Sequence, residues 1–450
     1  MIIDLPEHVT YILDTLAAHG HEGYAVGGCV RDALLGRQPQ DWDITTDAPP
    51  SLVKTLFRRT VDTGLQHGTV TVMLDHTGYE VTTYRIDGVY EDGRHPKKVS
   101  FTANLTEDLK RRDFTINAMA YNERDGLVDL FDGTGDLRRG MIRCVGVPEE
   151  RFTEDALRMM RAIRFSAQLG FSIEAGTLAA IRTLAPAIQK ISAERIRMEL
   201  LKTITSAHPM NMRLFYETGL TRFFLPEWDA MMETEQNNPH HCYSVGEHVL
   251  HSLPLVPPQK VLRLAMLLHD IAKPVCLVRD EGGIDHFHGH PQQGAQMAGR
   301  ILRRLKLDND TTARVCSLVR WHDDNPPLTA RNVRRAVCRV GKLQYPAIFA
   351  VKRADIGAQS DYKKKEKLRY VDEYEALYNN IVADENCLCV KDLAVDGSDL
   401  IAAGVPQGRQ IGAYLHRLLE LVVDEPERNT KDFLIGQVRI WNKTEGPFIG

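Results

Sequence analysis

The spacing of apolar residues changes once along this 450-residue chain, near residue 148, and the change limits the folds open to it. Before that point, runs such as TVTVMLD (69–75) and YEVTTYRID (79–87) alternate in the manner of β-strands. After it, runs such as EDALRMMRAIRFSAQLG (154–170) have the spacing of amphipathic helices. We therefore predict an α+β protein, in which a small α/β head precedes a mostly helical remainder.

The length predicts about three domains at ~100–200 residues each, and proline-bearing joints near 226, 257–258 and 326–327 mark candidate breaks. We place a head at 1–147, a helical neck at 148–230, a helical body at 231–360 and a helical tail at 361–450.

The balance of charge does not identify a binding partner, whereas the cysteine pattern indicates a reducing compartment. The 56 basic and 60 acidic residues nearly balance, so a nucleic-acid partner has to be argued from local basic surfaces. The densest charge run, 363–369, is typical of a solvated helix face, and contact with a phosphate backbone is the alternative. Eight scattered cysteines without a CxxC pair indicate reduced thiols. Without a signal peptide or a run of ~18 apolar residues, we expect a cytoplasmic protein with no membrane span.

The segment 27–46, GGCVRDALLGRQPQDWDITT, combines features of a nucleotide site. On a β-strand, Asp41 and Asp43 would project to one face, roughly 6–7 Å apart, where Mg²⁺ would relieve their repulsion. The turn at Gly27 and Gly28 would let backbone amides approach a triphosphate, which Arg31 would help to neutralise. Each feature alone is more often structural, but their combination favours nucleotidyl transfer. Glu80 is a candidate third carboxylate, with a surface strand residue as the alternative.

This segment resembles the signature of the class II branch of the polymerase β-type nucleotidyltransferase superfamily. That branch contains tRNA CCA-adding enzymes and bacterial poly(A) polymerases. Three further segments resemble its ribose-recognition motif, its base-selecting motif and its flexible loop: RRDFTINA (111–118), EDALRMMR (154–161) and DGVYEDGRHP (87–96).

The resemblance implies a polymerase β-like head and two roles for side chains beyond it. Asp113 and Asn117 would recognise a ribose hydroxyl, with a cap of the following helix as the alternative for Asp113. Asp155 and Arg158, on one helix face, would read the Watson–Crick edge of cytosine or adenine, with an i, i+3 surface salt bridge as the alternative. The predicted nucleotide-binding set is Gly27, Gly28, Arg31, Arg111, Arg112, Asp113, Asn117, Asp155, Arg158, Arg161 and Arg164.

The predicted body is rich in histidine and contains the doublet His269-Asp270. With a distant aspartate, this pattern resembles the HD metal-dependent phosphohydrolase superfamily. Imidazoles and carboxylates suit a transition metal that activates water. The alternative is a structural helical body. The predicted ligands are His248, His269, Asp270, His290, His322 and Asp355.

The resemblance implies a CCA-adding tRNA nucleotidyltransferase, which would add CMP, CMP and AMP to a tRNA 3′ end from CTP and ATP with Mg²⁺. The HD-type body would add phosphohydrolase or cyclic phosphodiesterase activity, and the tail would bind RNA. A poly(A) polymerase and an enzyme adding only CC or only A share the same motifs. Alternatives of another class are an HD phosphohydrolase with a degenerate RNA-binding head and a non-catalytic tRNA-binding factor.

Overall fold

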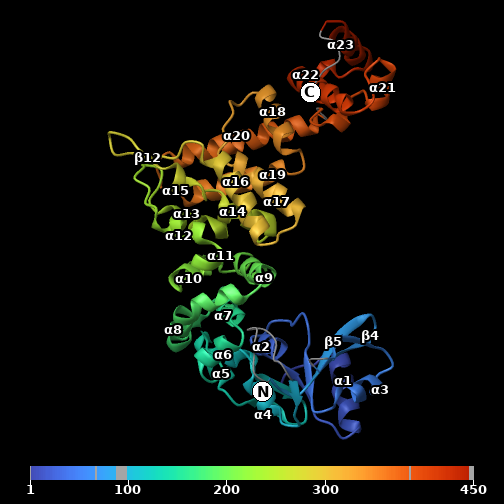
Figure 1. The fold of residues 1–450 in the computed structure, drawn as a ribbon, viewed down its shortest axis with the longest axis vertical. Coiled ribbons are helices and arrows are strands. Elements are labelled where there is room, and N and C mark those ends of the chain that lie inside the picture. Colours follow the sequence, from blue (N-terminus) through green and yellow to red (C-terminus); the bar gives the residue numbers. More distant parts are fainter. Residues whose placement is uncertain (1, 66–67, 88–98, 385–386, 445–450) are drawn as a thin grey trace. The chain divides into compact units, whose positions relative to one another are not determined.

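The computed structural model describes residues 2–65, 68–87, 99–384 and 387–444. The chain forms two compact units, Met1–Pro226 and Glu227–Gly450, which are described separately below (Figure 1). Strands occupy mainly the first part of the first unit, and helices make up most of the second, so the predicted α+β class is confirmed. The four-domain division stays a prediction. Within these ranges no helix is both long and apolar enough to cross a membrane.

A twisted mixed sheet forms the centre of the head. In the described ranges it has seven strands in the order β3-β4-β5-β2-β1-β8-β9. Strands β2 and β5 pair in parallel, while the other neighbours are antiparallel. The bounds are β1 Gly23–Val26, β2 Ile44–Thr46, β3 Thr60–Gly64, β4 Thr69–Leu74, β5 Thr77–Thr83, β8 Met119–Asn122 and β9 Gly126–Asp129.

Short helices cover the sheet and then replace it along the chain. Small strand pairs accompany them: β6 Arg85–Asp87 with β7 Val99–Phe101, and β10 Met141–Ile142 with β11 Ser172–Ile173. The predicted flexible loop, 87–96, lies outside the described residues except for Asp87. The helices are α1 Glu7–Ala18, α2 Gly28–Leu34, α3 Pro50–Leu56, α4 Leu105–Lys110, α5 Gly133–Arg139, α6 Pro148–Glu154, α7 Leu157–Leu169, α8 Ala175–Leu184, α9 Ala193–Ile204, α10 Met212–Glu217 and α11 Thr221–Phe224.

The second unit is a helical assembly with one small hairpin, β12 Val278–Arg279 and β13 Asp285–His286. Its first helices, α12 to α19, pack around a buried interior (Figure 1). The bounds are α12 Pro226–Glu233, α13 Val245–Ser252, α14 Lys260–Leu268, α15 Lys273–Cys276, α16 His290–Arg304, α17 Asn309–Trp321, α18 Ala330–Val340, α19 Tyr345–Ala358, α20 Lys364–Ala383, α21 Gly397–Ala402, α22 Arg409–Asp424 and α23 Lys431–Thr444.

Two apolar cores stabilise the end of the second unit. Aromatic side chains of α19 and α20, including Phe349 and Tyr374, fill one core together with α18. Leu418, Leu434 and Trp441 belong to the other, which joins α21, α22 and α23. Burial of this apolar surface holds the terminal helices in place.

Candidate functional sites

Three carboxylates of the head gather at one end of the β2–β5 pair. Ile44 pairs with Val81 in the parallel register, so Asp43 and Glu80 precede paired residues on neighbouring strands. The charges of Asp41 and Asp43 help burial to raise the pKa of Glu80. The pKa of Asp43 is also raised. Burial is the main cause, Asp41 adds to it, and Arg112 opposes it. All three side chains are solvent-accessible, so a cation can reach them.

The prediction that Asp41 and Asp43 lie on a strand is wrong, since β2 begins at Ile44. The Asp43 carbonyl still accepts a hydrogen bond from Val26 N at 2.9 Å. Beyond that point the neighbouring chain leaves the sheet at Gly27 to enter α2, so residues 41–42 have no strand to pair with on the β1 side. The two aspartates therefore occupy the loop entering β2, where strand pleating does not set the direction of their side chains.

The turn at Gly27 requires glycine for two reasons. Its φ is +85°, a conformation that L side chains rarely adopt. A Cβ there would also lie 3.0 Å from Arg112 Nη1. The turn therefore brings the backbone close to a guanidinium group, next to the acidic cluster that this guanidinium influences.

A buried polar network links α2 to the predicted ribose motif and to α7. Arg31 Nη1 donates to Asn117 Oδ1 at 2.7 Å, and Asn117 Nδ2 donates to Asp113 Oδ1 at 3.2 Å. Arg161 Nε donates to Asp113 Oδ2 at 2.7 Å. Burial would raise the pKa of Asp113, but Arg161 and Arg158 lower it to about 2. Asp113 does not cap the short helix that follows, since that helix has no side-chain cap.

Phe165, which the sequence did not single out, organises the arginines of this network. The guanidinium carbons of Arg31, Arg161 and Arg164 lie 5.2, 5.3 and 4.0 Å from its ring centroid. Arg164 also pairs with the buried Glu199, Nε to Oε2 at 2.7 Å. Burial lowers the pKa of Arg164 to about 10. An aromatic ring that contacts three guanidinium groups adds cation–π attraction to the network and fixes where these arginines lie.

The prediction that Asp155 and Arg158 share one helix face is wrong. Helix α6 ends at Glu154, Asp155 is extended (φ −142°), and α7 begins at Leu157. Asp155 Oδ1 accepts from Leu157 N at 3.0 Å, because a short carboxylate competes well for free amides at a helix start. The helical spacing continues through this break, which is why sequence periodicity misses it.

Asp155 and Arg158 are each paired with a different residue. Asp155 Oδ2 accepts a hydrogen bond of 2.7 Å from Arg195 Nη2 of α9, a partner that the sequence did not indicate. Arg158 Nη1 pairs with Glu154 Oε2 at 2.5 Å. Arg158 Nη2 also donates to the carbonyl of Arg111 at 3.0 Å, which ties the predicted base-selecting motif to the ribose motif.

Helices α13, α14, α16, α17 and α19 of the second unit bring all six predicted histidine and aspartate ligands together. His248 Nε2 lies 2.8 Å from Asp355 Oδ1, although 107 residues separate them. Asp270 lies between the two halves of the cluster, with His269 Nε2 at 3.3 Å from one oxygen and His290 Nε2 at 3.4 Å from the other. His322 Nε2 lies 3.3 Å from His290 Nε2. We refer to His248, His269, Asp270, His290, His322 and Asp355 as the His/Asp cluster.

The donors of the His/Asp cluster fit a metal ion. Two overlapping sets of three ligand atoms each lie within 4.8 Å: His248, His269 and Asp270, and Asp270, His290 and His322. His269 Nε2 is buried without a properly oriented hydrogen-bond partner, despite its short distance to Asp270. Burial lowers the pKa of His269, but Asp270 and Asp355 raise it to about 10. A cation would replace that proton, and mixed imidazole and carboxylate donors suit transition metals.

Lys273 is a member of this site that sequence reasoning missed. Its Nζ lies 2.7 Å from Asp270 Oδ2 and donates to Gln236 Oε1 at 2.9 Å. A cavity of about 430 Å³ adjoins it, and Asp270, His290 and His322 contribute to its lining. The lysine is the fifth residue of the HDIAK run, so its short distance from the doublet was the available signal.

Family models match three parts of the chain. They describe a poly A polymerase head domain (residues 23–143), a probable RNA- and SrmB-binding site of polymerase A (170–232) and a putative second domain of tRNA nucleotidyltransferases (290–438). The head with its gathered carboxylates thus has the fold of a nucleotidyltransferase, a class that uses divalent metal ions.

Relatives extend the similarity to nearly the whole chain. A CCA-adding enzyme of Limosilactobacillus fermentum is 38% identical over 92% of this chain and 91% of its own length. The chain belongs to the CCA-adding enzyme family. A relative from Lactiplantibacillus plantarum is 54% identical over 44% of this chain, and the match spans about half of that relative's length. The solved CCA-adding enzyme of Bacillus stearothermophilus in complex with CTP is 30% identical, with a TM-score of 0.72 over 97% of each chain.

Proposed function

We propose that this protein is a CCA-adding tRNA nucleotidyltransferase, which adds CMP, CMP and AMP to a tRNA 3′ end from CTP and ATP. The observation that carries the proposal is the gathering of Asp41, Asp43 and Glu80 beside the Gly27 turn in a chain of this family. Mg²⁺ held by these carboxylates would supply charge neutralisation at the transferred phosphate and an activated terminal hydroxyl.

The surrounding residues divide the work of binding the nucleotide. Arg31 and Arg112 would neutralise the triphosphate, because both guanidinium groups border the Gly27 turn. Asn117 and Asp113 would contact the ribose in an orientation that Arg31 and Arg161 already fix. This preorganisation reduces the conformational entropy lost when the nucleotide binds.

Asp155 and Arg158 are proposed to select the base through paired hydrogen bonds. Cytosine and adenine both present an amino donor beside a ring-nitrogen acceptor, which matches one carboxylate and one guanidinium group. In the nucleotide-free structure both groups are engaged by Arg195 and Glu154. These partners hold the two side chains apart from each other, so they do not neutralise one another before a base arrives.

The test is incorporation into tRNA that lacks its last three nucleotides, with each labelled triphosphate singly and then in pairs. Ordered C, C, A addition is expected. Long A tails would indicate a poly(A) polymerase. Addition of only C or only A would indicate an enzyme that completes only part of the CCA sequence. Asp41→Ala should abolish incorporation, whereas Asp62→Ala, an exposed carboxylate of β3 paired with Lys54, should not. Continued polymerisation by Asp41→Ala would contradict the metal assignment.

We propose a second activity, metal-dependent phosphoester hydrolysis, for the His/Asp cluster. The observation that favours it is the convergence of four imidazoles and two carboxylates, together with a buried His269 nitrogen that lacks a well-oriented partner. A transition metal bound there would supply an activated water. A phosphate or 2′,3′-cyclic phosphate at an RNA end is the proposed substrate.

Metal analysis and phosphate release test this second activity together. His269→Ala should lose bound metal and hydrolysis of 2′,3′-cyclic AMP, whereas His416→Ala, an exposed histidine of α22, should keep both. Hydrolysis by a protein that incorporates no nucleotide would favour the alternative in which the head is a degenerate RNA-binding module.

A further inference from the structure

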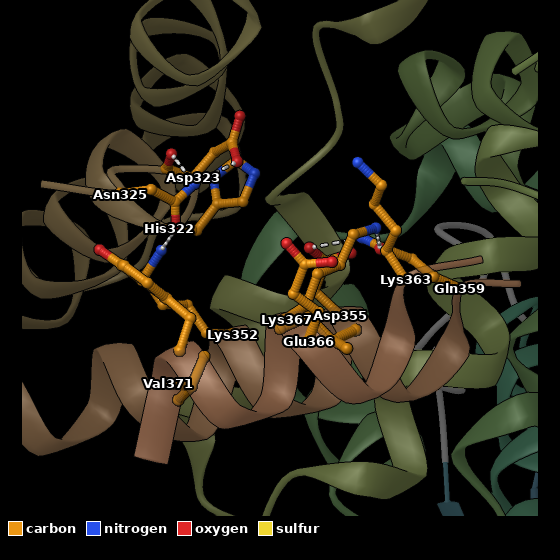
Figure 2. Close-up of a pocket in the computed structure, with 12 residues that line it drawn as sticks. His322, Asp323, Asn325, Lys352, Asp355, Gln359, Lys363, Glu366, Lys367 and Val371 are labelled. Atoms are coloured by element: carbon orange, nitrogen blue, oxygen red, sulfur yellow. Dashed lines mark hydrogen bonds between the residues drawn. The ribbon is translucent and has the colours of Figure 1, made fainter. Parts of the chain in front are cut away.

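A second cavity, of about 310 Å³, adjoins the His/Asp cluster on the side of α19 and α20 (Figure 2). It shares the cluster residues His322 and Asp355 with the cavity that contains Lys273. Its distinguishing feature is three lysines: Lys352 from α19, Lys363 just before α20, and Lys367 from its first turn. We call this space the lysine cavity.

Lys352 is a buried cation without an ionic partner. Its side chain is 4% exposed, and its Nζ donates to the amide oxygen Asn325 Oδ1 at 2.9 Å. Among the described residues no carboxylate lies within ion-pair distance of it. Burial lowers its pKa, which the more distant carboxylates of Asp323, Asp324 and Asp355 raise only in part. An ammonium group removed from water without a counter-ion costs free energy, which a bound anion would offset.

The other two lysines complete a cationic wall at the start of α20. Lys363 has φ +54°, a left-handed backbone conformation that is uncommon for a lysine, and it lines the cavity. Lys367 donates to Gln359 Oε1, and burial lowers its pKa. Asp323 and Glu366 also line the cavity, while Asp355 faces the proposed metal. A bound divalent cation would make the summed charge positive.

The far wall of the lysine cavity is partly apolar, with Ile356, Tyr370 and Val371. The lysine cavity thus places cations next to the His/Asp cluster and adds an apolar wall. Its volume lies within the usual range of small-molecule pockets, and these features together suit a nucleotide. The run 363–369 thus does more than form a solvated helix face, because two of its lysines point toward this space (Figure 2).

We propose that the lysine cavity binds the 5′-phosphate of a ribonucleotide whose 3′- or 2′,3′-cyclic phosphate lies at the His/Asp cluster. This assignment rests on the proposed phosphohydrolase function and names its substrate class: a nucleotide unit with phosphate on both sides of one ribose. Lys352 and Lys367 hold the 5′-phosphate, and the apolar wall contacts the ribose or base. A nucleoside 3′-phosphate without the 5′-phosphate leaves the buried Lys352 ammonium uncompensated.

The test compares adenosine 3′,5′-bisphosphate with adenosine 3′-monophosphate as substrates of the full-length protein. The wild-type KM should be about 10-fold lower for the bisphosphate, as expected for charge-assisted hydrogen bonds. Lys352→Met and Lys367→Met should remove this preference without changing kcat, metal content or the KM for the monophosphate. Lys365→Met, an exposed lysine of the same helix outside the cavity, is the matched control. Equal effects of the cavity variants on both substrates would overturn the proposal.

Binding separates failure of the lysine cavity from failure of hydrolysis. Calorimetric titration of His269→Ala, which lacks the charge of the metal, should show a smaller but still measurable bisphosphate preference, and Lys352→Met added to that variant should remove it. If the wild type hydrolyses neither compound but still binds the bisphosphate more tightly, the proposed 5′-phosphate site is supported and the proposed phosphohydrolase function is contradicted. If the bisphosphate binds no better than the monophosphate, the lysine cavity fails. Competition by an RNA trinucleotide with a 3′-phosphate supports an RNA end as the source, and absence of competition overturns that source.

Discussion

The carboxylates of the head and those of the second unit lie in opposite surroundings. Asp41 and Asp43 are exposed, in a loop, with another carboxylate and a guanidinium group nearby, whereas Asp270 is 1% exposed and lies among imidazoles. Exposed carboxylates leave most of a metal's coordination positions to water and substrate, which suits Mg²⁺. A buried His/Asp set supplies the ligands itself, which suits a transition metal. Aspartate would thus bind a metal loosely or firmly according to its burial.

Removal of metal should separate the two sites most strongly. Brief dialysis against EDTA should abolish nucleotide incorporation, because the head carboxylates exchange their ion with solvent, and added Mg²⁺ should restore it at once. The second unit should retain its metal through the same dialysis, as measured by elemental analysis, because the cluster is buried. Loss of both metals at the same rate would contradict the contrast in accessibility.

Lys273→Met should reveal how much the buried site depends on cations. Without the ammonium 2.7 Å from Asp270, the metal-free protein retains a buried carboxylate that lacks its lysine partner, at a cost of about 3–5 kcal/mol in the free energy of unfolding. Saturating metal should recover much of this loss, since the ion supplies positive charge. Denaturant unfolding with and without metal measures both values. Equal destabilisation in both states would show that Lys273 acts independently of the metal site.

Arg195→Ala should weaken base selection rather than catalysis. The bidentate Arg195 pair orients Asp155, so its loss should reduce discrimination of CTP and ATP against GTP and UTP by about 10-fold, the effect of losing about 1.4 kcal/mol. Arg195→Lys should restore it only partly. Arg182→Ala, an exposed arginine of α8, is the control. The measurement is kcat/KM for each triphosphate, and an equal fall for all four would indicate a structural role instead.

The smallest expected effect is a shift of the pH profile in Arg112→Gln. Arg112 lowers the pKa of Asp43, whereas burial and Asp41 raise it. Without this guanidinium the pKa of Asp43 rises, so the metal-binding carboxylate becomes protonated at a higher pH. The acidic limb of kcat/KM for incorporation should therefore move to higher pH, while that of phosphate release by the second unit stays in place. A shift to lower pH would contradict the assignment.

Sequence motifs predicted which side chains gather at both sites better than they predicted the geometry of those sites. The DWD and HD motifs named the proposed metal ligands directly, because hard and borderline cations restrict the residue types that bind them. The break at Asp155 was missed, since its carboxylate accepts a hydrogen bond from Leu157 N at the start of α7 without disturbing the helical spacing of apolar residues. Phe165 and Arg195 were missed because their roles depend on partners from other helices.

The sequence by itself determined the α+β class, the position of the change from strands to helices and the family, because periodicity and motifs are local. Only the tertiary structure decided what surrounds each motif. It placed Glu80 beside Asp43 through the β2–β5 register, and it brought His248 to Asp355 across 107 residues. It also turned Lys352 from one of many lysines into a buried cation beside the His/Asp cluster. Burial and charge at a site depend on distant segments that pack together, and local sequence does not encode that packing.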